Sequence, residues 1–566
     1  MRRIAPLLLA SALVLAACSS GGSDAGQDST TTKPKGSAST TTGAGGGETA
    51  GGGHACDQGA AFDEVPVEPV AGVDSDRTMT SPVDGTGIRL HWFPVAGASA
   101  DDPAPTILMG PGWSLPGDTS IDGDALFSAL TIGSMRKDGY NVLTWDPRGF
   151  GKSGGTATVN DPGKEGQDVR AMLDFVASQP GAQTDGEGDP RAGMVGFSYG
   201  GGIQLTTASI DCRVDAIVPG IAWNSLQTSL YKADTVKTGW AKVLTSAVDP
   251  DRLDPHINSA SASGLRDGTL SDEDRDWFVS RGPGDDAIAK IDIPTLFVQG
   301  TVDTLFSLDE ATTNYGILRK DDVPTAMLWF CGGHGTCLTD PGDRGRVAAA
   351  SFAWLDHYLK GEDTDLPAGV DLVDQDGRRW TAEDWPVAEG EPLTGTGSGT
   401  LALKAEGGSG GDPTALDLDP DDPLGGVVAS ITPTQADNAV DVAIDAGDAD
   451  VLALGAPKLT ITYSGDWTGD VQGAEGRVFA QLVDDETGLV LGNQITPIQV
   501  TVDGTTHTAE SDLEIIAHHV TPGHGITLQI VAATSAYGIP VKQGTIDFDS
   551  IEISVPTAAP KAVAQG

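Results

Sequence analysis

The sequence predicts an α/β fold, a mostly parallel sheet with a helical cap insert, followed by a C-terminal β-sandwich of jelly-roll type. Between about residues 76 and 364, short apolar runs alternate with segments of helical periodicity, as in a parallel sheet covered on both faces. From about 223 to 290, helix-like segments rich in aromatic residues interrupt this alternation. Beyond about 365, helical periodicity disappears and strand-like runs separated by Gly, Asp and Pro turns replace it.

The first 55 residues are interpreted as a targeting segment and a tether. A basic start precedes an apolar run that is too short to span a bilayer, and Leu15-Ala16-Ala17-Cys18 then resembles a bacterial lipobox. We expect residues 1–17 to be a lipoprotein signal peptide, Cys18 to carry lipid, and the protein to be exported and anchored to the cell membrane. The alternative is a secretory signal cut after Ala17. Residues 18–55 are rich in Gly, Ser and Thr, which predicts a flexible tether.

The later segments are expected to fold into two domains and a tail. Residues 56–364 would form the α/β domain with its cap, 365–555 the sandwich, and 556–566 a loose tail. The strands expected in the α/β domain are 88–93, 106–109, 141–145, the run ending at 195, 215–218, 294–300 and 326–330, with helices over 168–176 and 346–359. The clearest strands of the sandwich are expected at 459–463, 478–483, 528–531 and 551–555.

The most informative motif is Gly196-Phe197-Ser198-Tyr199-Gly200, which lies between an expected strand and an expected helix. A serine between two glycines in a strand–turn–helix unit is typical of the nucleophile elbow of α/β-hydrolases. The turn is so tight that the flanking positions must lack a Cβ. In a chain with 76 glycines the pattern alone is weak, so the order of the surrounding elements must support it.

A serine nucleophile needs a base, and in this fold the base is a histidine that follows the acid in the chain. The chain has nine histidines. His334 follows the last expected strand, where a loop could bring its imidazole to Ser198. His357 falls inside the closing helix and His256 inside the insert, so His334 is the predicted base.

The acid should follow the strand before the one that leads to the base. Asp303 comes just after the expected strand 294–300, and Asp309 and Glu310 are alternatives that would begin the next helix. We expect Asp303 to orient the imidazole. The oxyanion would be bound by the backbone N–H groups of Tyr199 and, from the loop after residue 109, Trp113.

Together these motifs resemble the cocaine esterase and X-prolyl dipeptidyl peptidase type of α/β-hydrolases over about residues 76–555. The resemblance is carried by Asp146-x-Arg148-Gly149-x-Gly151-x-Ser153-x-Gly155, Gly196-x-Ser198-Tyr199-x-Gly201, and Ile293-Pro294-Thr295-Leu296 leading to Gly300 and Asp303. It implies a serine hydrolase without a cofactor, acting on small-molecule esters or peptides, as an X-Pro-dipeptidyl-peptidase-like aminopeptidase or an acyl esterase. Some members use an oxyanion-loop tyrosine, whereas this chain has Gly110-Pro111-Gly112-Trp113. A non-enzymatic surface-binding lipoprotein on a hydrolase scaffold is the alternative.

Charge and cysteines restrict the partners and the compartment. The 566 residues carry a formal net charge of −46, which would repel a phosphate backbone, so no nucleic-acid partner is expected. The sequence contains neither an EF-hand loop nor C-x-x-C pairs, so no metal site is expected. If Cys18 carries lipid, four cysteines remain, and an exported protein usually pairs them. Of the three possible pairings, we expect the one that joins Cys331 to Cys337 and Cys56 to Cys212.

Overall fold

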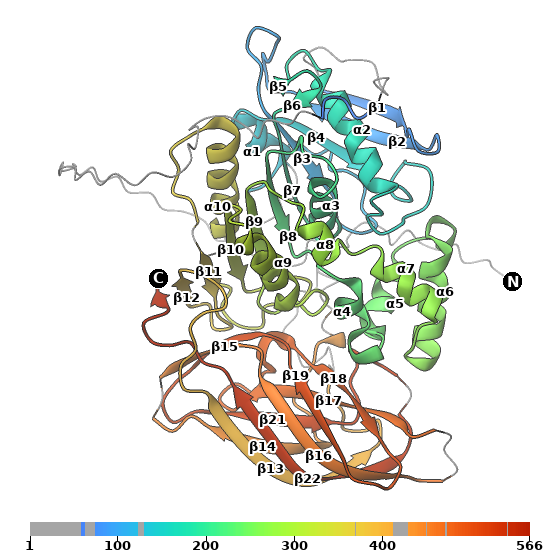
Figure 1. The fold of residues 1–566 in the computed structure, drawn as a ribbon, viewed down its shortest axis with the longest axis vertical. Coiled ribbons are helices and arrows are strands. Elements are labelled where there is room, and N and C mark those ends of the chain that lie inside the picture. The colour runs from blue at the N-terminus through green and yellow to red at the C-terminus, as the bar shows by residue number, and fades with distance from the viewer. Residues whose placement is uncertain are drawn as a thin grey trace, which may run out of the picture.

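The computed structural model describes residues 58–62, 74–122, 129–343, 345–367, 369–410, 428, 430–448, 450–469, 473–539 and 541–566. An α/β part and an antiparallel β part lie one above the other (Figure 1). The predicted signal peptide, the predicted tether, Cys18 as the predicted site of lipidation, and Cys56 all lie outside the described residues. Within the described ranges, no helix is long and apolar enough to cross a membrane.

The α/β part is built on one large sheet with the strand order β1-β2-β4-β3-β7-β8-β9-β10-β11-β12-β23. Neighbouring strands run parallel from β4 to β11, and the two edges are antiparallel. Its first eight strands are β1 (Ser75–Thr80), β2 (Gly87–Phe93), β3 (Thr106–Gly110), β4 (Asn141–Asp146), β7 (Ala192–Phe197), β8 (Ala216–Gly220), β9 (Thr295–Gly300) and β10 (Thr325–Phe330). Every residue of β3, β4, β7, β8 and β9 is buried, as expected for a sheet covered on both faces.

Helices cover both faces of this sheet. One hydrophobic core includes residues from α2, α3 and α9, and a second includes residues from α1 and α10. The bounds are α1 (Ile132–Lys137), α2 (Glu165–Ala177), α3 (Tyr199–Ala208), α9 (Leu308–Lys320) and α10 (Gly345–Leu355), the last continued by a π-helical turn, Asp356–Lys360. A small hairpin, β5 (Thr184–Gly186) with β6 (Asp189–Pro190), precedes β7. The α/β class predicted from the sequence is thus confirmed.

The helical insert lies between β8 and β9. It contains α4 (Leu226–Leu230), α5 (Thr238–Ser246), α6 (Pro255–Asp267), α7 (Asp272–Val279) and α8 (Gly284–Ile288), with 3₁₀ turns at Lys232–Asp234 and Pro250–Arg252. Buried insert residues such as Trp240 and Ile257 share one hydrophobic cluster with Trp113, Tyr199 and Phe306. The insert therefore packs over the loops at the carboxyl ends of the central strands, beside the sandwich (Figure 1).

The β part is a sandwich of two antiparallel four-stranded sheets, β13-β22-β16-β19 and β14-β21-β17-β18, with a shorter β15–β20 ladder. Alternate residues of β13, β14, β16 and β22 are buried between the sheets. The bounds are β13 (Leu393–Leu403), β14 (Ala439–Asp445), β15 (Val451–Gly455), β16 (Lys458–Trp467), β17 (Glu475–Asp484), β18 (Thr496–Thr501), β19 (His507–Asp512), β20 (Ile516–Val520), β21 (Gly525–Val531) and β22 (Gly544–Val555), with a 3₁₀ turn at Leu491–Asn493.

The large sheet continues past the boundary expected at residue 364. β11 (Val370–Val373) pairs with β10, β12 (Arg379–Ala382) returns beside it, and β23 (Ala564–Gln565) adds the last edge. The expected last strand, 326–330, is therefore followed by three more, and the expected tail 556–566 ends in a strand. These strands have only two to four residues each, and β11 and β23 each join the sheet beside a strand that is distant in the chain, so local periodicity does not reveal them.

Candidate active site

Ser198 occupies the turn between β7 and α3, with φ 58° and ψ −118°, in a region that residues other than glycine rarely adopt. The flanking glycines allow the close approach of β3. A Cβ added at Gly200 would lie 2.1 Å from the carbonyl oxygen of Gly110, and one at Gly196 would lie 2.7 Å from the same atom. The turn therefore has the geometry of a nucleophile elbow.

Ser198, His334 and Asp303 form one hydrogen-bonded chain. His334 Nε2 lies 2.7 Å from Ser198 Oγ, and His334 Nδ1 lies 2.8 Å from Asp303 Oδ2. The Asp303 side chain is fully buried, and its carboxylate also accepts backbone N–H groups from His334, Leu305 and Phe306 at 2.9 to 3.0 Å. These three donors, together with the imidazole, hold the carboxylate in a fixed orientation. The arrangement can take a proton from the serine and stabilise the imidazolium that results.

The alternative histidines and acids lie away from this hydrogen-bonded chain. His256 contacts Asp274 at 3.0 Å in the insert, and His357 contacts a backbone carbonyl of its own segment at 2.9 Å. Asp309 and Glu310 fall in the first turn of α9. The structure thus brings together the three residues predicted from the sequence and none of the four alternatives.

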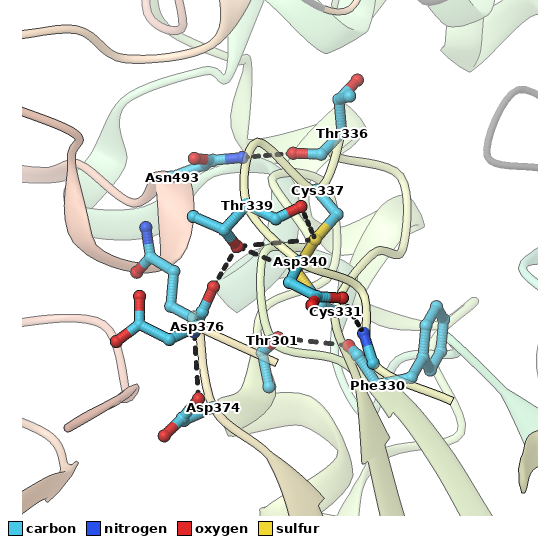
Figure 2. Close-up of a disulfide and its surroundings, with 12 residues drawn as sticks. Thr301, Phe330, Cys331, Thr336, Cys337, Thr339, Asp340, Asp374, Asp376 and Asn493 are labelled. Atoms are coloured by element: carbon cyan, nitrogen blue, oxygen red, sulfur yellow. Dashed lines mark hydrogen bonds between the residues drawn. A yellow bond between two sulfur atoms is a disulfide. The ribbon is translucent and has the colours of Figure 1, made fainter. Parts of the chain in front are cut away.

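The loop after β10 carries His334 and is closed by the Cys331–Cys337 disulfide, with a Cα–Cα distance of 5.4 Å. This is the pair predicted from the sequence. Figure 2 shows the side chain of Asn493, from the sandwich, donating to the carbonyl of Thr336 in this loop at 2.9 Å. A covalent bond and a contact from the sandwich therefore hold the loop.

The second predicted disulfide concerns Cys212. Cys212 is disulfide-bonded. Its predicted partner, Cys56, lies outside the described residues, so the pairing itself stays a prediction.

The loop after β9 carries Asp303 and is held by both the insert and the sandwich. The side-chain amide of Gln494 donates to the carbonyl of Asp303 at 2.6 Å. Lys237, at the start of α5, donates through Nζ to the carbonyls of Thr304 and Leu305 at 3.1 and 3.0 Å. Sequence reasoning missed Gln494 and Lys237, because they lie 191 and 67 residues from their partners and belong to no motif.

The two residues predicted to form the oxyanion hole border Ser198 from opposite segments. Tyr199 begins α3, and Trp113 lies in the loop after β3, with the two rings 5.3 Å apart in an edge contact. Their side-chain polar groups are engaged elsewhere. The Trp113 indole donates to the carbonyl of Leu244 at 3.0 Å, and the Tyr199 hydroxyl donates to Glu165 at 3.2 Å. Burial raises the pKa of the Tyr199 hydroxyl well above its usual value. Only backbone N–H groups could therefore serve there.

A cavity of about 110 Å³ adjoins the nucleophile, and Ser198, Tyr199 and Trp113 line it. Side chains of the insert and of the loop after β9 form most of its wall. Ser198 itself is only 5% exposed, so a bound acyl group would be largely shielded from water.

The fold and the hydrogen-bonded serine, histidine and aspartate define the class, a serine hydrolase of the α/β-hydrolase type. Residues 84–336 match the model of the X-Pro dipeptidyl-peptidase (S15) family, a range that contains all three residues. This match, with the solved structures below, confirms the resemblance expected from the sequence.

Two curated proteins match shorter stretches. An uncharacterised protein of Pseudomonas aeruginosa is 32% identical over 92 residues, covering 16% of this chain and 24% of that protein. A polyketide transferase of Gibberella fujikuroi is 22% identical over 202 residues, covering 34% of this chain and 57% of that protein. The chain thus spans about a quarter and somewhat over half of the lengths of these relatives.

Solved structures match almost the whole fold. A CocE/NonD family hydrolase from Staphylococcus aureus superposes with a TM-score of 0.62 at 13% identity, over 85% of this chain and 93% of that one. An α-amino acid ester hydrolase superposes with a TM-score of 0.64 at 13% identity, over 88% of this chain and 99% of that one. At such identity the likeness establishes the shared fold, sandwich included.

Proposed function

We propose that the protein is an exported serine hydrolase that cleaves ester or amide bonds through an acyl-enzyme on Ser198. The observation that carries the proposal is the hydrogen-bonded chain, with 2.7 Å from His334 Nε2 to Ser198 Oγ and 2.8 Å from His334 Nδ1 to Asp303. Both distances lie within the reach that proton transfer needs. The S15 family match over residues 84–336 supports the same reaction class.

In the first half of the reaction, Ser198 Oγ attacks the carbonyl carbon of the substrate while His334 Nε2 takes the serine proton. Buried Asp303 stabilises the imidazolium and holds Nδ1 protonated. The backbone N–H groups of Tyr199 and Trp113 bind the oxyanion, and losing such a donor typically costs about 3–4 kcal/mol. His334 then gives its proton to the leaving alcohol or amine as the acyl-enzyme forms.

In the second half, water attacks the acyl-enzyme. His334 takes a proton from the water and returns one to Ser198 Oγ, which releases the carboxylic acid and restores the free enzyme. Because Ser198 is nearly buried, little bulk water reaches the ester bond of the acyl-enzyme. The hydrolytic water must therefore enter through the space that the leaving group vacates.

The roles of the triad are tested by substitution with matched controls. On 4-nitrophenyl acetate, Ser198→Ala and His334→Ala should each lower kcat by about 10³-fold or more. Asp303→Asn should lower kcat by up to about 10⁴-fold, because the asparagine stabilises the wrong tautomer. Ser209→Ala, at the far end of α3 with its hydroxyl on the Thr206 carbonyl, should leave kcat unchanged. Undiminished turnover by folded Ser198→Ala would refute the proposal.

Export and lipid anchoring complete the proposed function. The support is the lipobox-like Leu15-Ala16-Ala17-Cys18, together with the Cys331–Cys337 disulfide, a bond that persists in oxidising compartments. In a bacterial host, the Cys18→Ser variant should lose a diacylglyceryl mass and leave the membrane fraction. If both proteins fractionate with the cytoplasm, the localisation is wrong, whatever the activity.

A further inference from the structure

The cavity beside Ser198 has a wall that is almost entirely apolar. α4, α5 and α6 of the insert and the loop after β9 contribute branched and aromatic side chains to it. Representative lining residues, all buried except the partly buried Leu230, are Leu226, Leu230, Val236, Ile257, Leu305 and Phe306. A cavity with such a lining favours an apolar occupant over water.

The charges at this cavity are positive. Among the described residues that line it, Lys237 and Arg275 are charged, and no carboxylate is present. Lys237 is buried, its ammonium donates to two backbone carbonyls, and burial lowers its pKa. Arg275 contacts Asp272 and Asp276 on its own helix, at 2.9 and 3.0 Å. Neither side chain would attract a positive charge.

Two buried glutamates contact Tyr199, which lines the cavity, and the backbone just before Leu226, which also lines it, but the glutamate oxygens are engaged. Glu165 accepts from the backbone N–H of Thr158 at 2.8 Å and from the hydroxyl of Tyr199 at 3.2 Å. Glu310 accepts from the backbone N–H groups of Asn224 and Ser225 at 2.7 and 2.9 Å. Burial raises the pKa of both carboxyls, which favours their neutral form. Neither side chain lines the cavity.

This lining discriminates between substrates that share the same scissile bond. In an α-amino acyl substrate, the ammonium is attached to the carbon next to the carbonyl that Ser198 attacks. It would therefore lose its water among apolar side chains, near Lys237 and with no carboxylate partner among the described residues that line the cavity. An unpaired buried charge of this kind is strongly disfavoured. An uncharged acyl chain meets no such penalty.

Resting on the proposed function, we propose that the site accepts esters and amides of uncharged, apolar acyl groups and rejects substrates with a free α-amino group. An apolar cavity of about 150 Å³ holds a benzene molecule, so about 110 Å³ suits roughly four or five carbon atoms. The enzyme would be an acyl esterase or an amidase for blocked substrates, and not a reader of peptide N-termini.

The direct test compares two esters that differ by one amino group, 4-nitrophenyl 4-methylpentanoate and the 4-nitrophenyl ester of leucine. At pH 6, kcat/KM should favour the uncharged ester by at least about a hundredfold, because burying an unpaired charge is unfavourable. Between pH 6 and 9 this ratio should shrink by up to about fiftyfold, as an amine with a pKa near 7.7 loses its proton. Equal or faster turnover of the leucine ester at pH 6 would overturn the inference.

Variants of the cavity wall test the same inference independently. Ala260 lines the cavity on α6, whereas Ala262 on the same helix is exposed and does not. Ala260→Leu should lower kcat/KM for the hexanoyl ester about tenfold and spare the acetyl ester, since each buried methylene contributes about fourfold. Ala262→Leu should leave the chain-length profile unchanged. Identical profiles for the two variants would contradict a cavity that binds the acyl chain.

A third variant reverses the charge selectivity. Gln227 lines the cavity in the first turn of α4 and is exposed, so Gln227→Glu introduces a carboxylate with little change of shape. It should raise kcat/KM for the leucine ester several-fold at pH 6 relative to the uncharged ester. No change in that ratio would contradict control of selectivity by the charge of the cavity.

A fluorophosphonate probe separates failure of this inference from failure of the proposed function. If wild-type protein is labelled at Ser198 but prefers the leucine ester, the proposed hydrolase function stands and the inference about the acyl group is wrong. If folded protein is neither labelled nor able to hydrolyse any ester, both are wrong.

Discussion

The contact between Gly200 and Gly110 predicts that one methyl group will disable the site. Gly200 is the second residue of α3, and a Cβ there would lie 2.1 Å from the Gly110 carbonyl oxygen and 2.7 Å from its carbonyl carbon. Ordinary contact begins at 3.4 Å, so α3 and the end of β3 must separate by roughly 1 Å in a close-packed interior. Ser198 lies on one side of that gap and the Trp113 loop on the other.

Two effects of Gly200→Ala follow from this separation. Overpacking of this kind destabilises a protein by about 1–3 kcal/mol. A shift of about 1 Å between a nucleophile and its oxyanion donors costs about a hundredfold in rate. We therefore expect kcat/KM on 4-nitrophenyl acetate to fall about a hundredfold, with the free energy of unfolding in urea lower by about 1–3 kcal/mol.

Gly316→Ala is the matched control. Gly316 lies within α9, where an added Cβ meets nothing within 4 Å. Since alanine is the better helix former, this variant should keep full activity and gain about 0.5–1 kcal/mol of stability. If Gly200→Ala and Gly316→Ala behave alike in both assays, the close approach of β3 and α3 does not constrain the site.

Three further outcomes follow from contacts around the site and the sheet. Gln494→Ala leaves the buried Asp303 carbonyl without its donor. We expect kcat/KM to fall about tenfold with KM nearly unchanged, and the free energy of unfolding to fall by about 1–3 kcal/mol. An unchanged kcat would exclude a positioning role for the sandwich. Cys337→Ser opens the loop that carries the base and should cost about 2 kcal/mol in urea unfolding, with reduced kcat. The Asp84 carboxylate accepts a hydrogen bond from Arg148 at 2.7 Å, and this bond lowers the pKa of Asp84 to about 2. The stabilising effect of Asp84 is therefore present above pH 4 and is lost as the pH falls towards 2. Asp84→Asn should therefore cost about 1 kcal/mol at pH 6, allowing for solvent screening of this half-exposed carboxylate, and progressively less below pH 4.

The catalytic candidates could be predicted because their positions follow from strand order. Ser198, Asp303 and His334 each follow the end of a strand within a few residues, and parallel strands bring their carboxyl ends to one edge of the sheet. The sequence contains only nine histidines, and the positions of the expected strands were enough to select His334 among them, because it follows the last expected strand of the α/β domain. The same reasoning identified the sandwich, because alternating burial leaves a clear local signal.

The remaining features depend on contacts between distant parts of the chain. β23 is held by pairing with β12 across more than 180 residues, and neither strand has an apolar run of its own. Gln494 acts on the Asp303 loop through one hydrogen bond and Lys237 through two, and such bonds leave no mark on local composition. The lining of the cavity, which has no carboxylate among the described residues, could not be predicted, because it forms only when the insert folds over Ser198.

The most direct test of the central claim is the intact mass and peptide map of the protein after treatment with a fluorophosphonate. Wild-type protein should gain one phosphonyl group, located on the peptide that contains Ser198. Folded Ser198→Ala should gain none, and His334→Ala should react at least about a hundredfold more slowly, because the serine lacks its base. A modification at another residue, or equal labelling of Ser198→Ala, would contradict the assignment of Ser198 as the nucleophile.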